Sequence, residues 1–122
     1  MSLHKLMTIN DLLTQLRQAP QSIEFADVIQ VISQFYTYKP TGFNNGPLHN
    51  LAGNNEGSCK ILYFAQLNAL TKIETLSLFG RYYRDDVLAN PTATDHENIR
   101  TFVRYGWAGI KFDREALKIL ML

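Results

Sequence analysis

Helix-start signals recur along this chain and divide it into short amphipathic helices. The first is Thr8, which precedes Asp11 and is followed by Leu12 and Leu16 on one helix face. A hydroxyl at the N-cap accepts a hydrogen bond from a first-turn backbone N–H, and apolar residues three or four positions apart line one face of a helix. Pro20 ends this helix, because a proline inside a helix removes a hydrogen bond and clashes with the preceding turn.

Two further helices are expected on either side of a glycine-rich region. Ser22 opens a helix that ends before Pro40, because the residue that precedes a proline avoids helical angles. Ser58 caps a helix that extends to about Ala69. This helix is apolar on nearly all sides, so we expect it at the centre of the domain.

Two capping boxes predict two more helices. Thr71 with Glu74 opens one, in which Gly80 is expected to introduce a kink, and Thr94 with Glu97 opens the other. In such a box the hydroxyl and the carboxylate each accept a hydrogen bond from a backbone N–H at the helix start.

The segment 40–57 holds four glycines, two prolines and five asparagines, a composition typical of turns. Loops of this length are uncommon in small domains unless they are functional or contain short strands, and residues 41–43 are expected to form such a strand. Phe43, Leu48 and Leu51 are spaced through the segment as apolar anchors. We therefore expect the segment to be ordered and packed against the core.

The C-terminal part of the chain is expected to contribute less regular structure. Residues 109–112 predict a short strand, and residues 115–122 predict one or two helical turns. Trp107 is interpreted as a packing anchor whose indole N–H donates to a nearby carbonyl. The whole pattern predicts a helix-dominated α+β fold, with one domain over residues 1–122, about five helices and a small two- or three-stranded β element.

The charge balance argues against several classes of partner. Twelve basic and eleven acidic residues leave a net charge of +1, whereas nucleic-acid binding needs clustered positive charge. No basic run and no long apolar stretch is present, so neither a membrane surface nor a membrane span is expected as a partner. A single cysteine cannot form an internal disulfide, and residues 8–17 have helical rather than signal-peptide character. We expect a cytoplasmic protein.

Six polar or glycine-containing blocks follow one another along the chain. They are 43–46 (FNNG), 54–60 (NNEGSCK), 75–76 with 78–80 (TL, LFG), 83–88 (YRDDVL), 95–96 with 98–100 (DH, NIR) and 106–109 (GWAG). In content, order and spacing these blocks resemble the HopJ type III effector protein family over about residues 23–117.

The resemblance implies a bacterial protein but no defined reaction. The family takes its name from a protein proposed to be injected into plant cells, and similar proteins occur in many bacteria. Type III secretion generally needs a disordered, polar N-terminus, whereas an amphipathic helix is expected from Thr8 onward. We therefore favour a cytoplasmic protein over one secreted through a type III system.

Cys59 and His96 are the candidate catalytic residues. Cys59 lies at an expected helix N-terminus, which stabilises a thiolate, the nucleophilic form of cysteine. His96 lies in the first turn of another helix, where the dipole favours a neutral imidazole that can accept a proton, and Glu56, Asp95 or Asn98 could orient it. Alternatively, Cys59 is a small buried residue that packs a helix start, and His96 is a surface residue in a capped turn.

The second hypothesis is a pocket for a small anionic ligand or a protein segment. Arginine binds carboxylate and phosphate through several N–H donors, and helix N-termini and amide side chains add further donors. Asp85 and Asp86 could instead neutralise the neighbouring Arg84 in a structural ion-pair network. The candidate ligand-binding residues are Asn45, Asn54, Glu56, Ser58, Arg84, Asp85, Asn98 and Arg100.

Most of these polar side chains are expected to converge in one cleft. Polar groups are costly to bury singly and are stabilised when they hydrogen-bond to one another. We favour a small-ligand or protein-binding module with this cleft, and the alternative is a small hydrolase or transferase that uses the cysteine and the histidine. The residues expected to converge are Glu56, Ser58, Arg84, Asp85, His96, Asn98 and Arg100.

Neither a metal site nor a cofactor site is expected. No pair of residues has a metal-ligand spacing such as i, i+4 histidines or Cys-x-x-Cys, and no phosphate-binding glycine motif is present. Hard cations prefer carboxylates, whereas zinc prefers imidazole and thiolate ligands. The residues that such sites would use are Glu56, Asp85, Asp86 and Asp95 for a hard cation, and His49, Cys59 and His96 for zinc.

Overall fold

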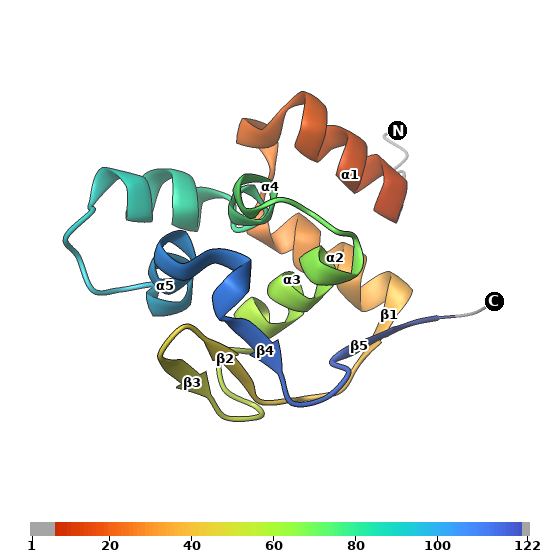
Figure 1. Cartoon of the computed structure of the whole chain (residues 1–122). Coiled ribbons are helices and arrows are strands. Elements are labelled where there is room, and N and C mark those ends of the chain that lie inside the picture. Colours follow the sequence, from red (N-terminus) through yellow and green to blue (C-terminus); the bar gives the residue numbers. More distant parts are fainter. Residues whose placement is uncertain (1–6, 121–122) are drawn as a thin grey trace.

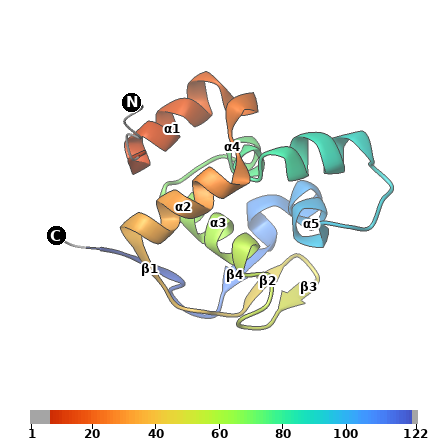
Figure 2. The same ribbon diagram turned by 180° about the vertical axis from the view of Figure 1, so that it is seen from behind.

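The helix α3 (Glu56–Leu67) runs through the centre of the fold. The computed structural model describes residues 7–120 of the chain. In Figures 1 and 2, α3 lies between the N-terminal helices on one side and the strands on the other. Its buried side chains confirm the central position that its apolar character predicts. The buried residues of α3 are Cys59, Ile61, Leu62, Tyr63, Phe64 and Ala65.

Five α-helices and five short strands form most of residues 7–120, which confirms the predicted helix-dominated α+β fold. Among these residues, no helix has the length and apolar character needed to cross a lipid bilayer. The other helices are α1 (Ile9–Gln18), α2 (Phe25–Phe35), α4 (Lys72–Ser77) and α5 (Glu97–Tyr105). The strands are β1 (Tyr36–Tyr38), β2 (Phe43–Asn45), β3 (Leu48–Asn50), β4 (Ile110–Phe112) and β5 (Leu117–Ile119). Short 3₁₀ turns lie at Pro20–Ser22 and Gly106–Gly109, and a π-helical turn lies at Tyr82–Val87.

The strands form two small antiparallel sheets. β2 pairs with β3 in a hairpin and with β4 on its other edge. β4 confirms the strand predicted near residues 109–112, and the strand expected at residues 41–43 begins at Phe43. The ring centroids of Phe43 and Phe112 lie 5.3 Å apart across this sheet. This stacking fixes the hairpin against the C-terminal part of the chain.

The segment 40–57 is therefore built around a β-hairpin. Phe43 is fully buried within it. Leu51 is 62% exposed, so its expected role as an apolar anchor is wrong. The turn after β3 carries Leu51 away from the core, a direction that the spacing of apolar residues does not show.

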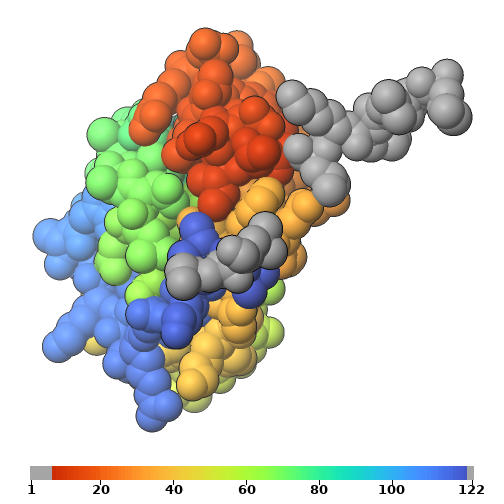
Figure 3. Space-filling model, turned by 90° about the vertical axis from the view of Figure 1, so that its right-hand side faces the viewer, coloured from red at the N-terminus to blue at the C-terminus, as the bar shows by residue number. Residues whose placement is uncertain are grey.

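The C-terminal segment is a strand, not the helical turns predicted for residues 115–122. β5 pairs antiparallel with β1, with Leu117 opposite Tyr38. Figure 3 shows the blue end of the chain beside the orange-yellow segment that contains β1. Leu117 is buried against the core, and the next two residues of the strand are exposed. Residues 121–122 lie outside the described part of the chain.

Two of the predicted capping signals are present as reciprocal capping boxes. The Thr8 hydroxyl accepts from the Asp11 N–H, and the Asp11 carboxylate accepts from the Thr8 N–H, both at 3.0 Å. Thr71 and Glu74 make the equivalent bonds at 3.1 and 2.9 Å. These helix starts were predictable because all of their partners lie within three residues of one another.

Other helix boundaries differ from the prediction. α2 begins at Phe25 rather than after Ser22, whose hydroxyl instead donates to the carbonyl of Ala19 within the 3₁₀ turn. α4 ends at Ser77, and Gly80 (φ +61°) lies in the break between α4 and the π-helical turn. The expected kink in one long helix is thus a break between two shorter elements.

Trp107 anchors the corner between α5 and β4. Its indole N–H donates to the carbonyl of Leu70 at 2.9 Å, and its ring packs edge-on against Phe102. These contacts confirm the packing role that was expected for this residue.

Candidate ligand-binding site

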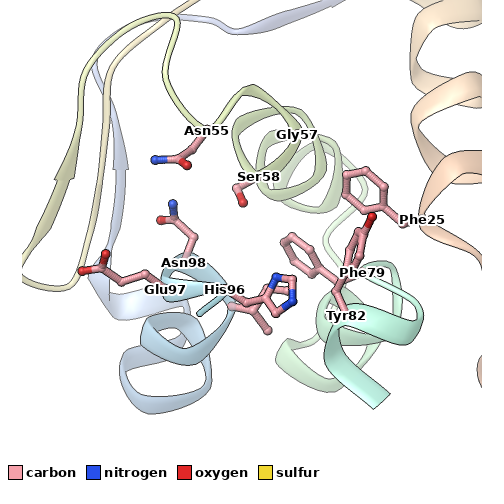
Figure 4. Close-up of a pocket in the computed structure, with 10 residues that line it drawn as sticks. Phe25, Asn55, Gly57, Ser58, Phe79, Tyr82, His96, Glu97 and Asn98 are labelled. Carbon is pink, nitrogen blue, oxygen red and sulfur yellow. The ribbon is translucent and has the colours of Figure 1, made fainter. Parts of the chain in front are cut away.

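A pocket of about 370 Å³ lies where the starts of α3 and α5 come together. Its lining combines an aromatic wall, made of Phe25, Phe79 and Tyr82, with the first residues of the two helices, which adjoin these rings. Figure 4 shows the imidazole of His96 beside the rings of Phe79 and Tyr82, and the hydroxyl of Ser58 directed into the space between α3 and these rings. We call it the α3–α5 pocket, and its lining residues are Phe25, Asn55, Gly57, Ser58, Phe79, Tyr82, His96, Glu97, Asn98 and Ile99.

Both helices at this pocket begin in the same way. Asn55 (φ 53°) and His96 (φ 50°) are the N-cap residues of α3 and α5, and both are left-handed. This conformation is uncommon outside glycine, although asparagine and histidine adopt it more often than most residues. The predictions that Ser58 caps α3 and that Thr94 with Glu97 caps α5 are therefore wrong, since neither helix has a side-chain cap. A left-handed N-cap turns the chain sharply into the helix and takes the place of the expected hydroxyl.

The first turn of each helix leaves backbone N–H groups available at the pocket. The first intrahelical bonds run to the carbonyls of the two N-cap residues, from Cys59 at 3.0 Å and from Arg100 at 3.1 Å. The N–H groups of residues 56–58 and 97–99 precede these bonds, and no described side chain caps them. The positive ends of two helix dipoles therefore lie at one pocket.

Four asparagines beside the pocket join the two helix starts, and we call them the asparagine network. The Oδ1 atom of Asn50 accepts hydrogen bonds from the side-chain amides of Asn55 at 2.8 Å and Asn98 at 2.9 Å. The Oδ1 atom of Asn98 accepts from Asn45 at 3.0 Å and from Asn50 at 3.1 Å. Three of the four residues, all except Asn55, are buried. The network therefore links α3, α5 and the hairpin through side-chain amides.

The imidazole of His96 is held by two acidic residues. Its Nε2 atom lies 2.9 Å from Oδ2 of Asp86 and 3.7 Å from Oδ2 of Asp95. The ring also packs against Tyr82, with the centroids 5.0 Å apart. These contacts set the orientation of the imidazole at the edge of the pocket.

Cys59 faces the core rather than the pocket. Its side chain is 1% exposed, and its thiol donates to the carbonyl of Thr41 at 3.7 Å. Burial raises the pKa of this thiol, which opposes formation of a nucleophilic thiolate. Within the described part of the chain, neither ring nitrogen of His96 is hydrogen-bonded to Cys59. The hypothesis of a catalytic cysteine–histidine pair therefore gains no supporting contact.

Arg84 lies away from the pocket. Its guanidinium donates to the carbonyl of Ile23 at 2.7 Å and lies 3.7 Å from the carboxylate of Glu24. These contacts join the π-helical turn to the segment before α2. Arg84 therefore has structural partners of its own, and these do not include the neighbouring Asp85.

Arg100 holds the segment that precedes α5. Its guanidinium donates to the carbonyl of Asp95 at 2.6 Å, to the Asp95 carboxylate at 2.7 Å and to the carbonyl of Asn90 at 2.7 Å. Hydrogen bonding to Arg100 lowers the pKa of Asp95. These bonds set the path of the chain into α5, and this path explains why Thr94 does not cap the helix.

The structure brings together only part of the expected polar set. Asn45 belongs to the asparagine network, and the exposed residues Asn54, Glu56 and Asp85 are outside the pocket lining, as are both arginines discussed above. The candidates that line the pocket are Ser58, His96 and Asn98.

Sequence reasoning misses the aromatic wall and the role of Asn50. The ring centroids of Phe25 and Tyr82 lie 5.1 Å apart, and those of Phe25 and Phe79 lie 6.5 Å apart. Phe79 belongs to one of the six sequence blocks and Tyr82 immediately precedes another, which is the available signal for these two residues. Phe25 carries no such signal, because it resembles any other apolar residue at a helix start.

Within residues 7–120, no group of three or more His, Cys, Asp or Glu side chains is arranged to hold a metal ion. Asp86 bonds to His96, and Asp95 bonds to Arg100. Asp86, Asp95 and His96 are thus engaged in contacts of other kinds.

This fold and pocket define a small, helix-dominated α+β domain, and comparison with known proteins identifies its family. The model of the HopJ type III effector protein family matches residues 9–117, so the chain belongs to this family. A crystal structure described as that of the unknown function protein VPA0580 has 43% sequence identity and a TM-score of 0.93. That similarity covers 98% of this chain and 100% of the other. Comparison with curated proteins gave no match.

Proposed function

We propose that the α3–α5 pocket binds a small ligand through a carboxylate or phosphate group. The observation that carries this proposal is that two helices present uncapped N-termini to the same pocket. A helix N-terminus carries a partial positive charge, and its free N–H groups bind anions. The protein would then be a ligand-binding module.

In this proposal the backbone, rather than an arginine, supplies most of the donors. Arg84 and Arg100 are engaged elsewhere, and His96 is paired with Asp86. Left-handed residues that lead into a right-handed helix turn successive N–H groups toward one point and form a concave anion-binding surface. The hydroxyl of Ser58 adds one donor to the pocket.

The aromatic wall supports a ligand that carries an apolar part beside its anionic group. Phe25, Phe79 and Tyr82 line the pocket beside the helix N-termini, with Phe25 against Gly57 and Tyr82 against His96. The volume of about 370 Å³ is at the lower end of the range of about 300–1,000 Å³ for small-molecule sites. The pocket therefore fits a metabolite-sized acid better than a long chain.

The test is a titration with inorganic phosphate and with phenyl phosphate, followed by ¹H–¹⁵N NMR. We expect the amide signals of residues 56–58 and 97–99 to shift together, because one anion would contact both helix N-termini. The Ser58→Asp variant places a carboxylate in the first turn of α3. We expect it to raise the melting temperature, since an acidic side chain stabilises a helix N-terminus, and to abolish binding of both probes.

The matched control is Gln66→Glu, which adds the same charge near the other end of α3. We expect this variant to bind both probes as the wild type does. Shifts in one helix only, or binding that survives in Ser58→Asp, would contradict the proposal. An absence of binding by the wild type would also overturn it.

The compartment belongs to the same proposal. We propose that the protein is cytoplasmic, because a single cysteine cannot form an internal disulfide and a buried free thiol fits a reducing compartment. Secretion through a type III system is the alternative, and the family name supports it. A reporter fused to the C-terminus of the chain, followed in the producing bacterium and in its medium, distinguishes these locations.

A further inference from the structure

We infer that Asn50 is the positioning residue of the α3–α5 pocket, because it sets the separation of the two helix N-termini. This inference rests on the proposed function, since the pocket is where the separation has a consequence. Asn50 lies on β3 and is not among the residues that line the pocket. Its effect on a ligand would therefore be transmitted through Asn55 and Asn98.

One oxygen atom of Asn50 serves both helices. Its Oδ1 accepts from Asn55, the N-cap of α3, at 2.8 Å and from Asn98, in the first turn of α5, at 2.9 Å. The side-chain amide of Asn50 then donates to Oδ1 of Asn98 at 3.1 Å and to the carbonyl of Phe43 at 3.4 Å. The two helix starts are thus tied to one point on the hairpin.

The chemistry of this position requires an amide. An aspartate would keep the acceptors but lose both donors, and a leucine would lose donors and acceptors alike. Asn50 is 3% exposed, so water cannot readily replace the lost partners. A change at Asn50 should therefore alter the arrangement of Asn55 and Asn98 rather than be solvated in place.

The separation of the N-termini matters because each contributes only at short range. The influence of a helix dipole falls off within the first turn, so an anion must lie close to both ends to gain from both. The asparagine network holds α3 and α5 at one distance before any ligand arrives. Such preorganisation reduces the cost of ordering the site on binding.

The test compares Asn50→Ala and Asn55→Gly with the control Asn68→Ala, and glycine is used at Asn55 because it keeps the left-handed backbone without strain. Asn68 lies at the other end of α3 and donates one side-chain hydrogen bond to the carbonyl of Phe64 at 2.9 Å. Its removal therefore costs a helix-end bond of similar kind outside the pocket. The first readout is amide exchange of Cys59 and Arg100 in the ligand-free protein, because their N–H groups make the first intrahelical bonds of α3 and α5.

We expect Asn50→Ala to accelerate exchange at both Cys59 and Arg100, Asn55→Gly to accelerate it at Cys59 alone, and Asn68→Ala to change neither. The second readout is the affinity for phenyl phosphate at a temperature where every variant is folded. Asn50→Ala should weaken it by about tenfold, which corresponds to about 1.4 kcal/mol and to the loss of about one hydrogen bond. The control should retain the wild-type affinity.

Exchange that rises at neither amide, or at one alone in Asn50→Ala, would overturn the positioning role. So would an affinity of Asn50→Ala equal to that of the control. If Asn50→Ala does not fold, Asn50→Leu, which removes the same donors and acceptor and leaves no cavity, is measured in its place with the same expected result. Failure of the wild type to bind phenyl phosphate would remove the proposed function, whereas the exchange measurements would still decide whether Asn50 joins the two helices.

Discussion

The Nε2 atom of His96 lies 2.9 Å from Oδ2 of Asp86, and this contact joins the start of α5 to the π-helical turn. His96 also has a left-handed backbone, with φ 50°. The side-chain contact and the backbone conformation therefore act together: the turn at His96 directs the chain into α5 and brings its ring to Asp86. Both features help to place the first turn of α5 at the pocket.

A pair of substitutions at His96 separates these two features. His96→Ala and His96→Gly both remove the imidazole, but alanine is strained in the left-handed conformation whereas glycine adopts it freely. We expect the glycine variant to be more stable than the alanine variant by about 1 kcal/mol, measured by urea unfolding. Equal stability of the two variants would mean that the backbone relaxes at this position without cost.

The thiol of Cys59 is expected to be inert in the folded protein. Burial raises its pKa, so iodoacetamide should label it slowly at neutral pH and quickly only after unfolding. Cys59→Ala should cost about 1 kcal/mol through lost packing. Rapid labelling of the native protein at pH 6 would instead reveal an activated thiolate and restore the enzyme hypothesis.

The same pKa shift of Cys59 predicts a dependence of stability on pH. The folded pKa is raised above that of an ordinary thiol, about 8.5. The contribution of the protonated thiol to stability is therefore fully present below the unfolded pKa and is lost as the pH rises toward the folded pKa. Between pH 7 and pH 9.5 the wild type should lose more unfolding free energy than Cys59→Ala. An identical loss in the two proteins would contradict this assignment.

Arg100→Ala should destabilise the protein because it releases the segment 90–95, which the guanidinium holds through several hydrogen bonds. The side chain of Asp95 is 59% exposed, so water can solvate its carboxylate once Arg100 is removed. We expect a loss of about 2 kcal/mol in urea unfolding, and Arg100→Lys should restore only part of it, because a lysine lacks the planar fork of donors. Arg104→Ala, an exposed change on the same helix, is the control and should stay within about 0.5 kcal/mol of the wild type.

Gly80 tests the packing at the break after α4, and Gly53, in the turn after β3, is the comparison. Both have positive φ, +61° and +90°, so alanine is strained at either position. A Cβ atom at Gly80 would lie 2.8 Å from the backbone nitrogen of Phe25, whereas one at Gly53 would meet nothing within 4 Å. We expect Gly53→Ala to cost about 1 kcal/mol and Gly80→Ala clearly more, because backbone must move. Thermal unfolding of the two variants would contradict this reasoning if their losses were the same.

Local signals in the sequence predicted the parts of the fold whose partners are close along the chain. Thr8 with Asp11 and Thr71 with Glu74 form capping boxes because every atom involved lies within one turn. The central position of α3 followed from its apolar surface, which must be covered on all sides. The family, too, was recognisable from short blocks of residues, and it is confirmed by a match over residues 9–117.

The candidate site was predicted less completely, because its contacts join distant segments. Ser58, His96 and Asn98 line one pocket. Arg84 and Arg100 lie outside its lining and donate to backbone carbonyls instead. Arg84 bonds to the carbonyl of Ile23, 61 residues away. The partners of Arg100 lie only five and ten residues away, but a backbone carbonyl carries no signal in the sequence. A polar residue next to a helix end has several possible neighbours, and only the packing of the helices selects among them.

The sequence by itself determined the family, the helix-dominated character of the chain and the helices whose caps are local. The tertiary structure decided that β5 is a strand, because its partner β1 lies about eighty residues earlier and supplies the hydrogen bonds that helical turns would otherwise make internally. It also decided where α3 and α5 begin, through the left-handed residues Asn55 and His96. The pocket depends on both helix starts at once. Its geometry is therefore a property of the packed chain, since no single segment contains both helix starts and the aromatic wall.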